Sequence, residues 1–210
     1  MTSAPSPRVG LTTPDELGPE ARELYDRIVS GPRKSQAGQA PITDANGALL
    51  GPFGLMTLAP AVGDAIQQVG AALRFSTGLS PLVREAAILL VASHHRSDFE
   101  WFAHVGLARA SGLTPEHIAA LGSGEVPAGL AVEDGDQLRV VRELLTHGGL
   151  RDETYRAALR DFGERTIAEL VWLCGYYGML ALALEVFAPP NPMESEPPPW
   201  RGPSPAAGGA

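Results

Sequence analysis

Proline recurs in this sequence at the first position of segments that have helical periodicity. Ser80-Pro81 and Thr114-Pro115 each place a capping residue directly before a proline, and Pro19 and Pro60 open two further segments. A helix tolerates proline at its first position because the N–H that proline lacks would have no partner there. We therefore expect helices to begin at these four places.

Apolar residues at helical spacing continue along most of the chain. No alternating pattern of the kind that predicts strands competes with them. The sequence therefore predicts an all-α fold, a helical bundle in one domain. The helices are expected at residues 19–30, 60–74, 81–93, 97–110, 115–121, about 134–147, 152–162 and 164–187.

Three stretches differ in composition from the expected helices. Residues 1–13 are rich in Ser, Thr and Pro, and residues 189–210 are rich in Pro and end in Gly and Ala. We expect both to be disordered tails around a single domain at residues 14–188, because such compositions bury too little apolar surface. Residues 33–54 predict a long loop, and long loops often carry function.

Charge and cysteine content narrow the classes of function. The net charge is −8 and no basic block is present, so we expect no nucleic-acid partner. The longest uncharged apolar run, residues 170–184, is too short to span a bilayer and predicts a buried core helix. Cys174 is the only cysteine, which excludes an intrachain disulfide. Together with the lack of a secretory signal, this favours a cytoplasmic protein.

Residues 84–104 contain the most chemistry in the chain. Glu100 and His104 are four residues apart, so they share one face of an expected helix. A carboxylate beside an imidazole fixes its tautomer and makes it more basic, as a general acid/base pair requires. Arg84, on the preceding helix, has the planar fork that binds a substrate carboxylate. Glu85 begins an apolar helix, so its charge needs solvent, a cleft or a partner.

Structural explanations compete with these functional ones. Ser97 and Glu100 also form a capping-box pattern, which is the favoured explanation on spacing alone. His94 and His95 point about 100° apart on a regular helix, so they cannot bind one ion together. We therefore expect no metal site, and we interpret both histidines as a polar helix end.

The stretch 84–112, REAAILLVASHHRSDFEWFAHVGLARASG, resembles the signature helices of the carboxymuconolactone decarboxylase family. That family includes the alkylhydroperoxidase D proteins. Residues 167–187 resemble its closing helix, and the Pro52-Phe53-Gly54 loop resembles that of its longer members. The resemblance implies an alkylhydroperoxidase D-like helical bundle that assembles as a homo-oligomer, a trimer or a hexamer.

The resemblance also separates two chemistries. The peroxidase branch has a Glu, a Cys-x-x-Cys pair and a His; Glu85 and His104 match, but Ser97 and Glu100 stand at the cysteine positions. The decarboxylase branch has an Arg, a Glu and a His, and Arg84, Glu100 and His104 match all three. The resemblance therefore implies a small-molecule lyase rather than a thiol peroxidase. A helical module that only binds a ligand or a partner is the remaining alternative.

The resulting hypothesis is a cofactor-free lyase or isomerase for a carboxylated lactone or enol acid. Arg84 would hold a carboxylate or enolate oxygen, His104 would move a proton at carbon, and Glu100 would orient His104. We expect Glu100 and His104 to touch, or to be one water apart, and to open to a cavity that Glu85 approaches.

The last expected helix also predicts an interface between subunits. It is apolar enough that we expect Trp172, Phe187 and the Tyr176–Tyr177 pair to lie near or beneath that interface. Gly175 and Gly178 would allow a neighbouring helix to approach closely.

Overall fold

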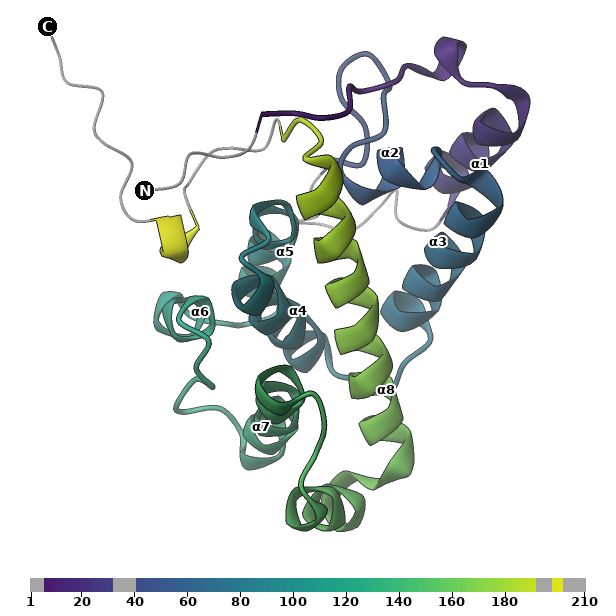
Figure 1. Ribbon diagram of the computed structural model, residues 1–210. Helices are drawn as coiled ribbons and strands as arrows, with labels where there is room; N and C mark the ends of the chain where they lie inside the picture. Colours follow the sequence, from purple (N-terminus) through teal and green to yellow (C-terminus); the bar gives the residue numbers. More distant parts are fainter. Residues whose placement is uncertain (1–5, 32–40, 192–197, 202–210) are drawn as a thin grey trace, which may run out of the picture.

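The computed structural model describes residues 6–31, 41–191 and 198–201, and its regular elements in these ranges are helices (Figure 1). The predicted all-α fold is confirmed. Residues 33–40 of the predicted loop lie outside the described residues, as do residues 1–5, 192–197 and 202–210 of the predicted tails. The elements are η1 (Pro14–Glu16), α1 (Pro19–Ser30), α2 (Pro52–Met56), α3 (Pro60–Phe75), α4 (Pro81–His95), α5 (Asp98–Ala110), α6 (Pro115–Gly122), α7 (Val132–His147), α8 (Asp152–Phe187) and η3 (Pro199–Arg201).

The proline signals mark true helix starts. α1, α3, α4 and α6 each begin at the predicted proline. The Ser80 side chain accepts a hydrogen bond from the Val83 amide at 3.1 Å. The Thr114 hydroxyl accepts one from the His117 amide at 3.3 Å. These side chains bind amides that have no partner within the helix, which fixes where α4 and α6 begin.

Helix α4 is the centre of the core. Its residues 85–92 are all buried, and it packs against α5, α6, α7 and α8. Figure 1 shows α8 running between α3 and the α4–α5 pair, with α7 below α4. A helix segment that is apolar on every side is stable only when it is surrounded by other elements. The arrangement leaves the carboxyl group of Glu85 inside the protein.

Helix α8 consists of two helical segments joined at a glycine. Gly163 has a φ of 79° inside α8, which is not a helical conformation. A left-handed backbone favours glycine because glycine has no Cβ. The sequence predicted this break between residues 162 and 164, and the prediction is confirmed.

Parts of both predicted tails are folded. The Arg8 amide and guanidinium donate hydrogen bonds to the carbonyls of Phe187 and Val186, at 3.3 and 2.8 Å. Near the other end, η3 packs against α6, and Trp200 lies edge-on to Trp101 with ring centroids 5.2 Å apart. The prediction of disorder was wrong for these residues, because composition does not report contacts with distant parts of the chain.

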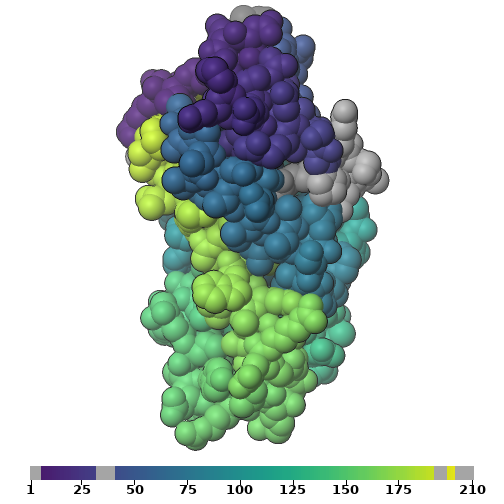
Figure 2. Space-filling model, turned by 90° about the vertical axis from the view of Figure 1, so that its right-hand side faces the viewer, coloured from purple at the N-terminus to yellow at the C-terminus, as the bar shows by residue number. Residues whose placement is uncertain are grey.

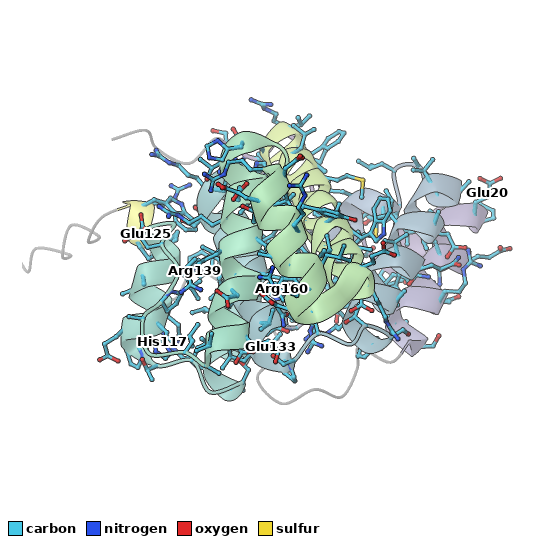
Figure 3. All side chains as sticks on the ribbon, turned by 90° about the horizontal axis from the view of Figure 1, so that it is seen from below. Glu20, His117, Glu125, Glu133, Arg139 and Arg160 are labelled. Carbon is cyan, nitrogen blue, oxygen red and sulfur yellow. The ribbon has the colours of Figure 1, made fainter. Side chains whose placement is uncertain are left out.

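Charged side chains gather on the outside of the helices that surround α4. Figure 3, seen from below, shows His117, Glu125, Glu133 and Arg139 around α6 and α7, with Glu20 at the far end on α1. Arg139 and Glu125 each belong to a separate exposed ion pair, and such pairs contribute little stability. These charged residues therefore lie on or beside α1, α6 and α7 and do not belong to helix α8.

Helix α8 buries one face and exposes the other. Only 44% of its most apolar 18-residue window is buried, so the prediction of a buried core helix holds for one face. Within the described residues, α8 is the one helix long and apolar enough to cross a membrane, a test that core helices of soluble proteins also pass. Its exposed residues at spacings of three and four form what we call the α8 seam: Ala168, Trp172, Gly175, Met179, Leu182 and Val186.

The α8 seam continues onto a neighbouring apolar surface. α3 packs against α8 and exposes Val62, Val69 and Phe75. Figure 2 shows α3 and α8 side by side on one face of the molecule. Alternating spacings of three and four residues are the pattern with which one helix packs along another. Contiguous apolar surface of this kind marks an interaction site.

We expect a second copy of the chain to cover the α8 seam. Trp172 and Leu182 are 66% and 64% exposed, so replacing Leu182 with Glu places a charge in the seam without disturbing the core. Light scattering at micromolar concentration should show an oligomer for the unmodified protein and a monomer for Leu182→Glu. Thr146→Glu, which adds the same charge to exposed α7, should leave the oligomer intact. A monomeric unmodified protein would contradict this expectation.

Candidate active site

A hydrogen bond between two helices lies at the heart of the site. Glu85, in the second turn of α4, is hydrogen-bonded to His104 of α5. Its Oε2 atom lies 2.8 Å from Nδ1 of the imidazole. A tight turn brings the helices together, because Arg96 adopts a left-handed conformation and the Ser97 amide bonds back to the Ala92 carbonyl. Since Nδ1 is engaged by Glu85, Nε2 is the ring nitrogen left for a ligand.

Two arginines share the other oxygen of the Glu85 carboxylate. Arg84 Nε lies 3.4 Å from Oε1, and Arg74 Nη1 lies 3.8 Å from the same atom. Arg84 Nη1 also donates to the Arg74 carbonyl at 3.2 Å, which ties the end of α3 to the start of α4. The carboxylate is therefore surrounded by partners of opposite charge.

These partners decide the ionisation of Glu85. Burial alone would raise its pKa, because it disfavours the charged form. The hydrogen bond with His104 and the charges of His104, Arg74 and Arg84 outweigh burial and hold the pKa below its usual value. Glu85 is therefore a carboxylate that accepts a hydrogen bond from the Nδ1–H group of His104.

His104 lines a cavity between α3, α5, α8 and the segment that leads into α2. Its volume is about 80 Å³. The walls are mainly apolar, and their polar groups come from Arg74, Glu100, His104 and the two tyrosines of α8. The lining residues are Pro41, Ile42, Pro52, Phe53, Gly70, Arg74, Phe99, Glu100, Ala103, His104, Leu107, Tyr176, Tyr177 and Leu180.

The segment before α2 is held by local hydrogen bonds. Asp44 accepts from the amides of Asn46 and Ala48 at 2.9 and 2.8 Å, and the Tyr25 hydroxyl donates to the Gly47 carbonyl at 2.9 Å. At Gly51, φ is 54° and a Cβ would lie 2.1 Å from the Phe99 ring. Only glycine fits there, and its absence of a side chain lets this segment close over the α5 wall.

Glu100 is a second carboxyl in the cavity wall, with opposite surroundings. It is 2% exposed, and neither of its oxygens has a hydrogen-bond partner. The Ser97 hydroxyl is also buried without a partner, so the predicted capping box does not form. Burial raises the pKa of Glu100 well above its usual value. Burial therefore favours the uncharged form of Glu100.

No direct hydrogen bond joins Glu100 and His104 in the described structure, and the predicted alternative, a link through one water, stays a prediction. Both residues line the cavity, as expected, but Glu85 rather than Glu100 orients the imidazole. Spacing along α5 put Glu100 within reach of His104. The contact between helices, with a carboxylate supported by two arginines, satisfies Nδ1 instead.

The cation in the cavity wall is Arg74 rather than the predicted Arg84. Arg84 lies behind Glu85 and is not among the lining residues, whereas Arg74 lines the cavity from α3. The sequence analysis missed Arg74. Its signal is a buried arginine in the last turn of an otherwise apolar helix, a position that requires a partner inside the fold.

Tyr176 and Tyr177 were also assigned to a different place. Both line the cavity, and the Tyr177 ring meets the His104 ring edge-on, with centroids 5.2 Å apart. Burial is the main cause of a raised pKa at Tyr177, so it remains a neutral phenol. The tyrosines thus lie on the inner face of α8, opposite the α8 seam.

Comparison with known proteins agrees with this geometry. The sequence model described as "Carboxymuconolactone decarboxylase family" matches residues 60–143, which include Arg74, Glu85, Glu100 and His104. Over these residues the chain is similar to the carboxymuconolactone decarboxylase family. The search of curated proteins found no match.

A solved structure has a similar fold over most of the chain. It is described as the alkylhydroperoxidase AhpD core, an uncharacterized peroxidase-related protein from Ralstonia eutropha JMP134. The TM-score is 0.66 at 13% identity, over 89% of this chain and 92% of that one. At this identity the likeness extends to the fold alone, and the chemistry must be argued from the residues present.

Cys174, the one cysteine of the chain, lies outside the cavity. Cys174 lines a separate groove with His94 and His95, and burial raises its pKa to about 12. It is therefore a protonated thiol at neutral pH, as predicted. Among the described residues, no group of three or more His, Cys, Asp or Glu side chains could hold a metal ion.

The opposite ionisation of the two glutamates predicts opposite effects of pH on stability. The raised pKa of Glu100 means that its contribution to stability is present below the unfolded value of 4.5 and is lost as pH rises toward the folded pKa. Glu100→Gln cannot ionise, so its melting temperature should exceed that of the unmodified protein by a margin that grows with pH above 4.5.

Glu85→Gln is the matched control. The lowered pKa of Glu85 means that its contribution is present above 4.5 and is lost as pH falls through the folded pKa. At neutral pH this variant should unfold with about 3–5 kcal/mol less free energy, because it breaks a buried charge pair. The deficit should shrink in acid. Melting curves for the three proteins from about pH 3 to 8 test both signs, and parallel curves would refute the ionisation states given above.

Proposed function

We propose that this protein is a cofactor-free acid/base enzyme, a lyase or isomerase, acting on a small carboxylated or enolic molecule. The observation that carries the proposal is the meeting of two groups in one cavity: the buried, unpartnered carboxyl of Glu100 and the His104 imidazole held by Glu85. One is a proton donor, and the other presents a basic nitrogen. This combination serves reactions that pass through an enolate.

The roles follow from the positions of the residues. A neutral carboxylic acid such as Glu100 donates a hydrogen bond to an oxygen that gains negative charge. Arg74 supplies positive charge at the same cavity, and the apolar walls strengthen both interactions by excluding water. His104 transfers a proton at carbon through Nε2, while Glu85 stabilises the imidazolium that forms.

A decarboxylation would balance as follows. The bond between the substrate carboxylate and its neighbouring carbon breaks, and carbon dioxide leaves. The electron pair of that bond becomes an enolate, whose oxygen Glu100 and Arg74 stabilise. His104, in its protonated form, then delivers a proton to carbon. An isomerisation uses the same groups, with His104 first removing a proton from one carbon and then returning it to another.

The competing function is a thiol peroxidase, because the similar solved structure is described as a peroxidase-related protein. Ser97 and Glu100 occupy the positions where the resemblance places two thiols. The one thiol of the chain, at Cys174, is protonated and borders a different groove. These residues favour acid/base chemistry over a thiol cycle. A cytoplasmic location and assembly as a trimer or hexamer remain predictions.

A screen of small carboxylated lactones and enol acids for carbon dioxide release or isomerisation tests the proposal. Against a substrate found in this way, His104→Ala should lower kcat roughly 10²–10⁴-fold, because the acid/base group is lost. Arg74→Lys should also lower activity, since lysine keeps the charge but not the planar fork. Cys174→Ser should retain full activity.

The same variants distinguish the competing function. Each is first checked for folding by circular dichroism, and each is also assayed for hydroperoxide reduction with a dithiol reductant. Peroxidase activity that disappears in Cys174→Ser and survives in His104→Ala would overturn the acid/base proposal.

A further inference from the structure

The two oxygens of Glu100 are the unusual feature of the cavity. Buried polar atoms in folded proteins are almost always hydrogen-bonded, because an unpaired one costs about 1–3 kcal/mol. Both Glu100 oxygens are buried and unpaired, while the residue itself lines the cavity. A buried group that has no internal partner needs an explanation, and a hydrogen bond to a bound molecule is one.

The surrounding side chains leave Glu100 without a partner of their own. The Nδ1 atom of His104 is committed to Glu85. The Ser97 hydroxyl, one turn earlier on the same helix, forms no hydrogen bond. The remaining neighbours in the α5 wall, Phe99, Ala103 and Leu107, are apolar. The missing partner must therefore come from the cavity.

The chemistry of an uncharged carboxyl defines that partner. Among the described residues no donor is hydrogen-bonded to Glu100, although Arg74 lines the same cavity. The uncharged carboxyl presents one O–H donor and one C=O acceptor, side by side. Both are satisfied at once by a ligand that carries a carbonyl with an adjacent X–H on the same edge. Cis-lactams and un-ionised carboxylic acids have this edge. Esters, lactones and ketones have the acceptor alone.

We propose that the cavity recognises its ligand through a cyclic pair of hydrogen bonds to the two Glu100 oxygens, and so selects small apolar molecules with a cis-lactam or carboxylic-acid edge. The rest of the ligand meets an apolar wall built from Ile42, Phe99, Leu107 and Leu180. A volume of about 80 Å³ is smaller than the roughly 150 Å³ cavity that holds benzene, so the cavity encloses the hydrogen-bonding edge of a small ring but not the whole ring.

This inference rests on the proposed function in one respect, that Glu100 faces the substrate. It adds the class of ligand that Glu100 selects. It can be tested by binding alone, without any turnover.

The probes are two rings that differ by one group, δ-valerolactam and δ-valerolactone. They have the same size, but the lactam carries an N–H beside its carbonyl where the lactone has an oxygen. Binding to the full-length protein is followed by NMR chemical-shift titration at pH 6. We expect the lactam to bind roughly tenfold more tightly or better, the effect of one extra buried hydrogen bond.

Variants at Glu100 assign the preference to its oxygens. Glu100→Gln keeps a donor and an acceptor side by side and should retain the preference for the lactam. Glu100→Leu removes both and should bring the ratio of the two affinities close to one while still binding the lactone. Glu164→Gln, the same substitution at an exposed position of α8, should behave as the unmodified protein.

Three results would overturn the inference: equal affinity for the two rings in the unmodified protein, a preference that survives in Glu100→Leu, or no binding of either ring. The inference and the proposed function can also fail separately. Selective lactam binding with no turnover of any enol acid would leave the recognition mode standing and remove the lyase. Turnover that depends on His104, without the lactam preference, would do the reverse.

Discussion

The buried carboxylate of Glu85 is the interaction on which the site depends. It lies in α4, a helix surrounded by four others, where an unpaired charge would cost several kcal/mol. Its partners come from three elements: Arg74 from α3, Arg84 from α4 and His104 from α5. Satisfying this one charge therefore fixes how α3 and α5 sit against the core. The same contact sets the tautomer of the imidazole that faces the cavity.

The two glutamates of the site show how surroundings divide one residue type into two roles. The cations and the imidazole around Glu85 lower its pKa, whereas burial without a hydrogen-bond partner raises the pKa of Glu100. Pairs of titratable groups whose pKa values are pushed apart are a usual basis of acid and base roles in one site. In the proposed function, Glu85 positions the imidazole and Glu100 is the acid in the cavity wall.

The sequence predicted the helices well because their boundaries are local. A capping residue with a proline at Ser80-Pro81, or a glycine at position 163, acts within a few residues and needs no knowledge of the fold. The site residues His104, Glu100 and Glu85 also do line or support one cavity. The hydrogen-bond partner of His104 was not predicted, because spacing along one helix shows which residues are neighbours but not which of them forms the hydrogen bond. Arg74 and Trp200 were missed because their partners, Glu85 and Asp98, are distant in sequence.

The protonation state of Glu100 is the central claim, because both its role as proton donor and its selection of ligands depend on it. Carbon-13 NMR of protein labelled at the glutamate carboxyl carbons measures this state directly, and Glu100→Gln assigns the resonance. We predict that one carboxyl signal keeps the chemical shift of the protonated form at neutral pH and that this signal is missing from the variant. A Glu100 signal with the chemical shift of the ionised form at neutral pH would contradict the claim.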